Sequence, residues 1–209
     1  MDDRHYKKEG IKYERVSNIL STYNDPKLEA WKINSAKNAV LKYEDTLINR
    51  DTILKCFRSA TEVGKHAMGI GTNVDDAIRG HYEGYAIKLK TKEAENCFKA
   101  FLQWKQDYGV ETAISGTTLY DDDSRIAGTP DLWLPDETLD IKCSSAIRDN
   151  YWLQTEWYAR KKGHSFKSIL RLDKSLGIYE YKKIPVSDYH LQVFEALITA
   201  FRYYNQVPQ

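Results

Sequence analysis

The stretch that decides the fold is "GTPDLWLPDETLDIKCSS", residues 128–145. Two short apolar runs flank a turn-forming Pro-Asp-Glu, so we expect two neighbouring strands of a hairpin. Asp140 and Lys142 are two residues apart, and side chains alternate along a strand, so both point to one face while Ile141 points into the core. Asp131 lies on the neighbouring strand. The hairpin therefore predicts that two carboxylates and an ammonium group converge.

This combination of groups is typical of a site where a metal ion meets a phosphate. Two carboxylates repel each other in a partly desolvated cleft, and hard carboxylate oxygens suit Mg²⁺ or Mn²⁺. The lysine can contact a phosphate oxygen or orient an attacking water. The alternative is a solvated, charged strand face, because the same kind of triplet recurs at Glu180-Tyr-Lys182. Gly128 and Pro130, just before Asp131, favour the site.

The rest of the chain predicts an α/β fold, with a central mixed β-sheet flanked by helices. Apolar residues at helical spacing and β-branched runs between turn signals give the expected elements. We expect helices at 25–50, 71–89, 92–109, 151–163 and 186–205, and strand segments at 110–120, 125–134, 138–144, 165–173 and 177–184. The chain is expected to form a single domain, 1–209. Within it, 1–108 is mostly helical, 109–185 holds the catalytic sheet and a helix, and 186–209 is a C-terminal helix.

Composition narrows the class of protein. The 209 residues are 42% hydrophobic and 29% charged, as expected for one globular domain. No apolar run approaches the length of a membrane span, and the polar N-terminus resembles no targeting signal, so we expect a cytoplasmic protein without a membrane partner. Cys56, Cys97 and Cys143 are too widely spaced for a zinc site or an iron–sulfur cluster. The net charge of +1 requires that any attraction for nucleic acid come from a local groove.

The motif GTPDLWL…LDIKCSS resembles the core of the PD-(D/E)xK nuclease superfamily, and more narrowly its RecB-like and phage-exonuclease branch. Gln154-Thr-Glu-Trp-Tyr158 matches the Gln-x-x-x-Tyr element of that branch, and Glu111 matches an acidic residue on the preceding strand. Segments 15–32 and 71–84 resemble two helical segments that open many phage members. The order and spacing of these motifs carry the resemblance over most of the chain.

The resemblance implies a restriction-endonuclease-like core with an N-terminal helical extension. It implies a Mg²⁺- or Mn²⁺-dependent DNA nuclease, with exonuclease activity in recombination or repair inside a bacterial cell or a phage-infected host. A homo-oligomer or a recombination partner protein is compatible with it. One alternative is a catalytically inactive nucleic-acid-binding module on the same fold, and another is a protein-interaction domain that binds no metal.

The expected site follows residue by residue. One or two metal ions would be bound by Asp131, Asp140 and the carbonyl oxygen of Ile141. The resemblance also implies that Glu111 assists in binding the metal. Lys142 would stabilise the attacking water or the reacting phosphate.

One position departs from the family pattern. The opening segment usually reads Gly-Thr-x-x-His, with the histidine as a metal ligand, whereas this chain has Asp75 in that place. Asp75 can supply an oxygen ligand that favours hard cations. Asp76 is an adjacent alternative, and His81 is poorly phased to replace the missing ligand. The competing interpretation is that Asp75 is an acid at a helix N-terminus that interacts with the helix dipole.

Four further residues are expected to contact DNA. Gln154 and Tyr158 are four apart and share a helix face, so both can hydrogen-bond DNA or hold the lysine and water. Tyr158 can also be a core residue that presents its hydroxyl. Arg148 and Lys161 supply positive charge near the motif, although such charges usually lie on solvated helix faces.

Overall fold

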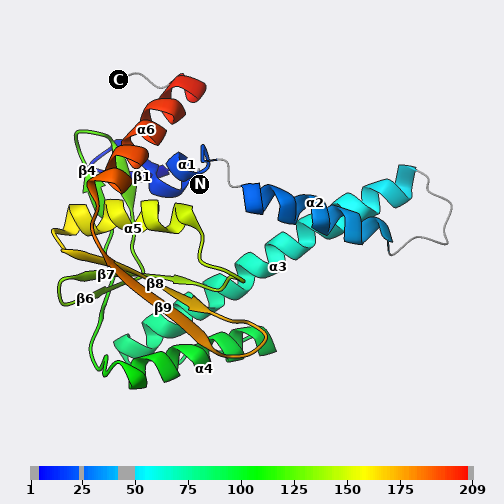
Figure 1. Ribbon diagram of the computed structural model, residues 1–209, viewed down its shortest axis with the longest axis horizontal. Coiled ribbons are helices and arrows are strands. Elements are labelled where there is room, and N and C mark those ends of the chain that lie inside the picture. Colours follow the sequence, from blue (N-terminus) through cyan, green and yellow to red (C-terminus); the bar gives the residue numbers. More distant parts are fainter. Residues whose placement is uncertain (1–4, 24–25, 42–49, 207–209) are drawn as a thin grey trace.

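Two β-sheets and six helices make up the described part of the chain, which is a computed structural model of residues 5–23, 26–41 and 50–206 (Figure 1). The helices are α1 (Val16–Leu20), α2 (Pro26–Leu41), α3 (Arg50–Glu83), α4 (Lys92–Asp107), α5 (Asp149–Lys162) and α6 (Asp188–Asn205). The strands are β1 (His5–Lys8), β2 (Ile11–Arg15), β3 (Ile114–Ser115), β4 (Leu119–Asp121), β5 (Ile126–Gly128), β6 (Leu132–Leu134), β7 (Glu137–Lys142), β8 (Phe166–Leu172) and β9 (Tyr179–Pro185). The expected α/β class is confirmed.

The larger sheet has the strand order β3-β6-β7-β8-β9. Its only parallel pair in the described residues is β7 with β8, and α5 is the crossover between them, as a parallel connection requires. Helix α5 packs on one face of this sheet, while α3 and α4 lie against the other (Figure 1). The faces of β7 are therefore covered by different helices.

The smaller sheet, β1-β2-β5-β4, corrects the expectation of one central sheet. The strands predicted at 110–120 and 125–134 each divide into two, so that β3 and β6 join the larger sheet while β4 and β5 join the smaller one. A Cβ added at Gly116 would lie 1.8 Å from the carbonyl oxygen of Pro130, so only glycine fits there.

The hairpin of β1 and β2 was not expected from the sequence. Its two-residue turn, Glu9-Gly10, has φ values of 51° and 80°, the combination that a type I′ turn requires. The paired strands are rich in charged residues, and β2 adds in parallel to β5. The N-terminal part is therefore helical with a β-hairpin at its start.

The long helices differ from expectation in their limits. Of the helix predicted at 25–50, the structure describes Pro26–Leu41 as α2, and residues 25 and 42–49 lie outside the described residues. The 34-residue helix α3 begins at Arg50. The helix predicted at 71–89 is the C-terminal part of α3, which ends at Glu83. Helix α2 packs on the N-terminal half of α3, and the pair projects away from the sheets (Figure 1).

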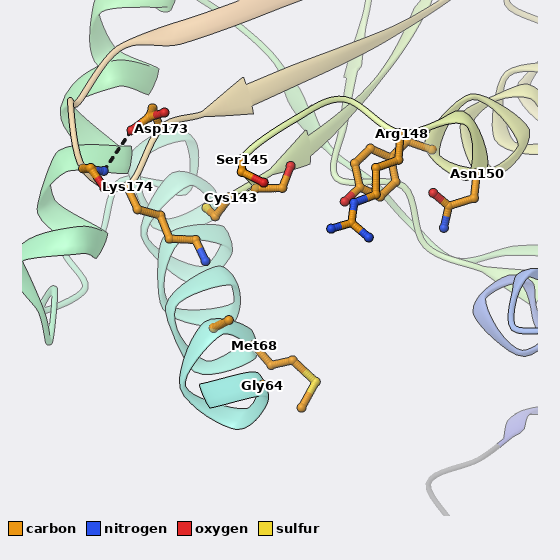
Figure 2. Close-up of a pocket in the computed structure, with 12 residues that line it drawn as sticks. Gly64, Met68, Cys143, Ser145, Arg148, Asn150, Asp173 and Lys174 are labelled. Atoms are coloured by element: carbon orange, nitrogen blue, oxygen red, sulfur yellow. Dashed lines mark hydrogen bonds between the residues drawn. The ribbon is translucent and has the colours of Figure 1, made fainter. Parts of the chain in front are cut away.

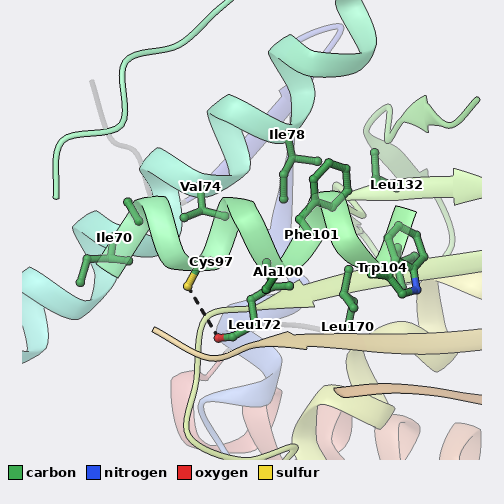
Figure 3. Close-up of a cluster of buried hydrophobic side chains, with 12 residues drawn as sticks. Ile70, Val74, Ile78, Cys97, Ala100, Phe101, Trp104, Leu132, Leu170 and Leu172 are labelled. Atoms are coloured by element: carbon green, nitrogen blue, oxygen red, sulfur yellow. Dashed lines mark hydrogen bonds between the residues drawn. The ribbon is translucent and has the colours of Figure 1, made fainter. Parts of the chain in front are cut away.

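Two hydrophobic cores fix the layers. The first fills the space between α3, α4 and the larger sheet, with Phe101 and Trp104 fully buried (Figure 3). The second lies on the other side, where α5 meets α1 and α6 around Trp157 and Phe194. Because α5 lies between the sheet and the second core, its inward-facing residues are held from both sides.

The described residues bear on two sequence expectations, the absence of a membrane span and the state of the cysteines. Within the described ranges, no helix combines the length and the apolar character needed to cross a bilayer. Cys97 and Cys143 are free thiols, and the side chain of Cys56 lies outside the described part.

Candidate functional site

Strand β7 presents its polar residues to the face that α5 covers. Leu139 and Ile141 pack into the core under α3 and α4, so alternation turns Asp140 and Lys142 the other way, as expected. The Lys142 ammonium lies 2.7 Å from Oδ2 of Asp140. This pair is more deeply buried than the similar triplet at Glu180–Lys182.

The burial of the two triplets separates a site from a solvated strand face. The side chains of Asp140 and Lys142 are 2% and 22% exposed, whereas those of Glu180 and Lys182 are 37% and 56% exposed. An exposed ion pair contributes little and needs no further explanation, but a buried charge carries a large desolvation cost. The alternative of a solvated face therefore applies to Glu180–Lys182 and does not apply to Asp140–Lys142.

Asp131 joins this pair from the neighbouring strand. Leu132 is paired with Leu139 in the antiparallel register, so Asp131, one residue earlier, lies across from Asp140. Its Oδ2 accepts a hydrogen bond of 2.6 Å from the amide of Ile141. The structure thus brings Asp131, Asp140 and Lys142 together.

Asp75 approaches the same place from α3. It lies well inside this helix, 25 residues after its start at Arg50, so the interpretation as an N-terminal acid on the helix dipole is wrong. Its Oδ2 accepts a 3.2 Å ion-pair contact from Arg79, one turn further on. The charges of Asp131 and Lys142 both act on Asp75. We call Asp75, Asp131 and Asp140 the carboxylate cluster.

The electrostatics show a surplus of negative charge. Burial, followed by repulsion from Asp140, raises the pKa of Asp131 to about 7. Burial, followed by repulsion from Asp131, raises the pKa of Asp75 to about 6. Burial also raises the pKa of Asp140, against the attraction of Lys142. The pKa of Lys142 is raised as well, since its two aspartate neighbours outweigh its burial. Such shifts are typical of functional sites.

Gln154 and Tyr158 extend the site along α5. The Lys142 ammonium donates a 3.2 Å hydrogen bond to Oε1 of Gln154, and Nε2 of Gln154 donates one of 3.3 Å to the Tyr158 hydroxyl. The Tyr158 ring is buried in the second core, while its hydroxyl is held by Gln154. A Cβ added at Gly128 would lie 2.7 Å from its ring, so the glycine of the motif makes room for this tyrosine.

The remaining expected residues lie elsewhere. Glu111 is 79% exposed and forms a 3.1 Å ion pair with Lys105, and its charge acts on His81 and Tyr82. Lys161 pairs with Asp121 of β4 at 2.8 Å.

Arg148 is the N-cap residue of α5, directly after the β7–α5 loop. Tyr151 and Arg79 were not foreseen. The Lys142 ammonium lies 5.1 Å from the centre of the Tyr151 ring, within cation–π range. Tyr151 is three residues after Arg148, and Arg79 is four residues after Asp75, so helical spacing was the available signal for both.

The donor atoms present suit a hard cation, with one qualification. Oδ2 of Asp140 is buried, and the charged group beside it is the Lys142 ammonium at 2.7 Å. Carboxylate oxygens of two neighbouring aspartates are the kind of donor that Mg²⁺ and Mn²⁺ prefer. Within the described residues, however, no three His, Cys, Asp or Glu side chains gather closely enough to hold an ion by themselves. Asp131 and Asp140 with a backbone carbonyl therefore fit better than a three-carboxylate cage.

Two cavities adjoin the site. The catalytic cavity, about 540 Å³, is lined by Lys142 and Gln154 and lies between α1, α2 and the start of α5. The side cavity, about 650 Å³, lies between α3, the β7–α5 loop and the β8–β9 loop (Figure 2). Asn150 and Tyr151 line both, so the two cavities meet at the first turn of α5.

No protein-family model matches the chain, and a search of curated proteins also finds no match. Solved structures of similar fold include the alkaline exonuclease LHK-Exo of Laribacter hongkongensis, with a TM-score of 0.43 and 16% identity over 50% of this chain and 62% of that one. The complex of LHK-Exo with dAMP aligns with a TM-score of 0.47 and 12% identity, over 92% of this chain and 87% of that one. A phage-related exonuclease of Haemophilus somnus 129PT aligns with a TM-score of 0.40 and 15% identity, over 65% of this chain and 81% of that one. The chain spans less than two thirds of the first of these chains.

Proposed function

We propose that the chain is a Mg²⁺- or Mn²⁺-dependent deoxyribonuclease, acting as an exonuclease on phage or bacterial DNA in recombination or repair. The observation that carries the proposal is the burial of Asp131, Asp140 and Lys142 on one sheet face beside an open cavity. Two carboxylates with raised pKa values and a lysine in contact with one of them match what phosphodiester hydrolysis needs.

The roles of the residues follow from their positions. Asp131, Asp140 and the carbonyl oxygen of Ile141 would hold a divalent ion, with Asp75 as a neighbouring oxygen donor. An ion bound there supplies Lewis-acid activation of water and neutralises charge on the leaving oxygen. Glu111 would have to leave its ion pair with Lys105 to assist.

The remaining side chains act on the phosphate and its surroundings. Lys142 donates hydrogen bonds to a phosphate oxygen or to the attacking water, as a charged donor aimed at developing negative charge. Gln154 holds the Lys142 ammonium through its amide oxygen, and Tyr158 accepts from the Gln154 amide nitrogen. Because Tyr158 is clamped in the core, this chain of contacts orients Lys142 toward the catalytic cavity.

The test compares DNA cleavage by matched variants. Purified protein is incubated with linear duplex, single-stranded and covalently closed DNA, with Mg²⁺ or Mn²⁺ and with chelator. We expect cleavage of linear DNA that requires metal and is lost in Lys142→Ala and Asp140→Asn. Lys182→Ala is the control, because it removes a lysine of the same kind of triplet from an exposed ion pair. Full activity of Lys142→Ala would rule out the proposed site, and cleavage of closed circles would rule out an exonuclease.

A second candidate is a nucleic-acid-binding module without catalysis. It is favoured by the contacts that two cluster residues already make, since Asp140 is paired with Lys142 and Asp75 with Arg79. Such pairs satisfy negative charge without a metal. This candidate predicts DNA binding without cleavage under every metal condition, and no change in melting temperature when Mn²⁺ is added.

A further inference from the structure

The side cavity carries a second concentration of chemistry that the proposed reaction does not use. It begins where the catalytic cavity ends, at Tyr151 and Asn150, and extends to Met68 and Gly64 of α3 (Figure 2). At about 650 Å³ it has the size of a small-molecule site. A ligand in the catalytic cavity that continued past Tyr151 would enter it.

Positive charge faces this cavity from two loops. Arg148, at the start of α5, and Lys174, in the β8–β9 loop, both line it, and Figure 2 shows their side chains extending into the open space. Asp173 is the acidic residue in the lining. Its Oδ1 accepts from the amides of Ser175 and Leu176, each at 2.9 Å.

The remaining oxygen of Asp173 is also neutralised. Its Oδ2 accepts a 3.1 Å bond from Arg171, which pairs at 2.8 Å with Glu180 as well. Asp173 is thus committed to shaping its own loop, so the two basic residues of the lining outnumber its one acidic residue.

The walls of the cavity are held in place before any ligand binds. Nδ2 of Asn96 on α4 donates to the carbonyl oxygens of Lys174 and Ser175, at 2.8 and 3.2 Å. Arg171 donates to the carbonyl oxygen of Ser144 at 3.4 Å and so links the two loops. A pre-formed cationic cavity costs little ordering energy on binding.

Apolar contacts are available next to these charges. Tyr151 presents an aromatic ring at the junction of the cavities, and Met68 is 67% exposed although it lines the cavity wall. Aromatic rings beside cationic groups are the combination with which proteins bind single-stranded nucleic acid, by stacking bases and pairing phosphates.

We infer that the side cavity is a nucleotide-binding subsite, in which Lys174 and Arg148 hold a phosphate and Tyr151 and Met68 contact a base of single-stranded DNA. The inference rests on the proposed function, since it places the subsite next to the cleaved bond. The phosphate comes either from the strand that continues past the catalytic cavity or from a released mononucleotide. The chemistry of recognition is the same for both sources.

The experiment measures binding without cleavage, in chelator, by fluorescence anisotropy of a short labelled single strand over a range of salt concentrations. Lys174→Gln should bind about tenfold more weakly, and the slope of log K against log salt should fall by about 0.7 for the lost phosphate contact. Lys174→Arg should restore binding. Lys99→Gln, on the exposed side of α4, is the matched control and should bind like wild type.

The outcomes separate the two proposals. If Lys174→Gln binds like Lys99→Gln while wild type cleaves DNA, the subsite is wrong and the nuclease stands. If wild type never cleaves but the affinity still depends on Lys174, the nuclease is wrong and the subsite stands. Competition by a free deoxynucleoside monophosphate that disappears in Lys174→Gln identifies the mononucleotide as a source. Competition by strands alone identifies the continuing strand.

Discussion

Replacing Asp131 by Asn should make the metal-free protein more stable at alkaline pH. The pKa of Asp131 is about 7 in the folded protein, against 3.8 for an unperturbed aspartate. Between these values the folded state keeps a proton that the unfolded state has lost, so the free energy of unfolding falls as pH rises through this window. Above pH 7 the whole penalty is present, and it amounts to about 4 kcal/mol.

The substitution removes the charge while it keeps the local contacts. The amide oxygen of Asn can still accept the bond from the Ile141 amide, which Asp131 now accepts at 2.6 Å. The pKa of about 7 already includes the attraction of Lys142. The cost that the variant adds is burial of the Asn amide nitrogen, so we expect about half of the gain to remain, about 2 kcal/mol at pH 8. For a chain of this size, that corresponds to a rise in melting temperature of about 4–8 °C.

Chemical denaturation in chelator measures this effect, followed by the fluorescence of the five tryptophans. Wild type should lose stability between pH 4.5 and 8, and Asp131→Asn should lose much less. Asp123→Asn, at an exposed position in the β4–β5 turn, is the control and should follow wild type. An Asp131→Asn protein that is less stable than wild type at pH 8 would refute the reasoning, because the charge would then be stabilising.

Three further predictions concern stability and metal binding. Gly128→Ala should destabilise the protein by about 1–3 kcal/mol, because the added Cβ would lie 2.7 Å from the Tyr158 ring. Gly64→Ala should stabilise α3 by about 0.5–1 kcal/mol, because its Cβ would meet nothing within 4 Å. Thermal melts of both variants check this. Lys167→Met should lower the free energy of unfolding by about 3 kcal/mol, because the buried Glu156 carboxylate loses its fully buried cationic partner and keeps Arg160 and the Ser187 amide. A double variant that also replaces Glu156 by Gln should recover part of the loss in urea titrations. Mg²⁺ added after chelator treatment should raise the melting temperature more at pH 8 than at pH 5. At pH 5 the carboxylate cluster keeps protons that a cation must displace. An equal rise at both pH values would contradict this.

Strand β7 and its neighbour β6 were predictable because the information that places their polar residues is local. Alternation along residues 138–142 places Asp140 and Lys142 on one face whatever the rest of the chain does, and the two-residue turn at 135–136 brings Asp131 opposite. The spacing of Gln154 and Tyr158 is equally local, since four residues make about one helical turn. Each of these relations needed one secondary-structure element or one hairpin.

What the sequence did not reveal depends on contacts between distant segments. Where two expected strands divide between two sheets, Gly116 approaches Pro130 closely, and this contact becomes visible when both segments are placed. Likewise, Glu111 has the right chemistry and order, but the structure turns it toward Lys105. The charged hairpin of β1 and β2 lacks a clear alternating pattern, and its Glu9-Gly10 turn was its one local signal.

The effect of Asp75 on ligand binding follows from the net charge of the groups around it. With all groups ionised, the three carboxylates of the cluster and the two cations beside it, Lys142 and Arg79, carry one net negative charge. A phosphodiester, itself singly negative, would be repelled by this arrangement. On the proposed function, a divalent ion reverses the sign, so a phosphate then completes a neutral assembly. On this proposal the negative charge of Asp75 ties DNA affinity to the ion, and by linkage the DNA strengthens binding of the ion to the same degree.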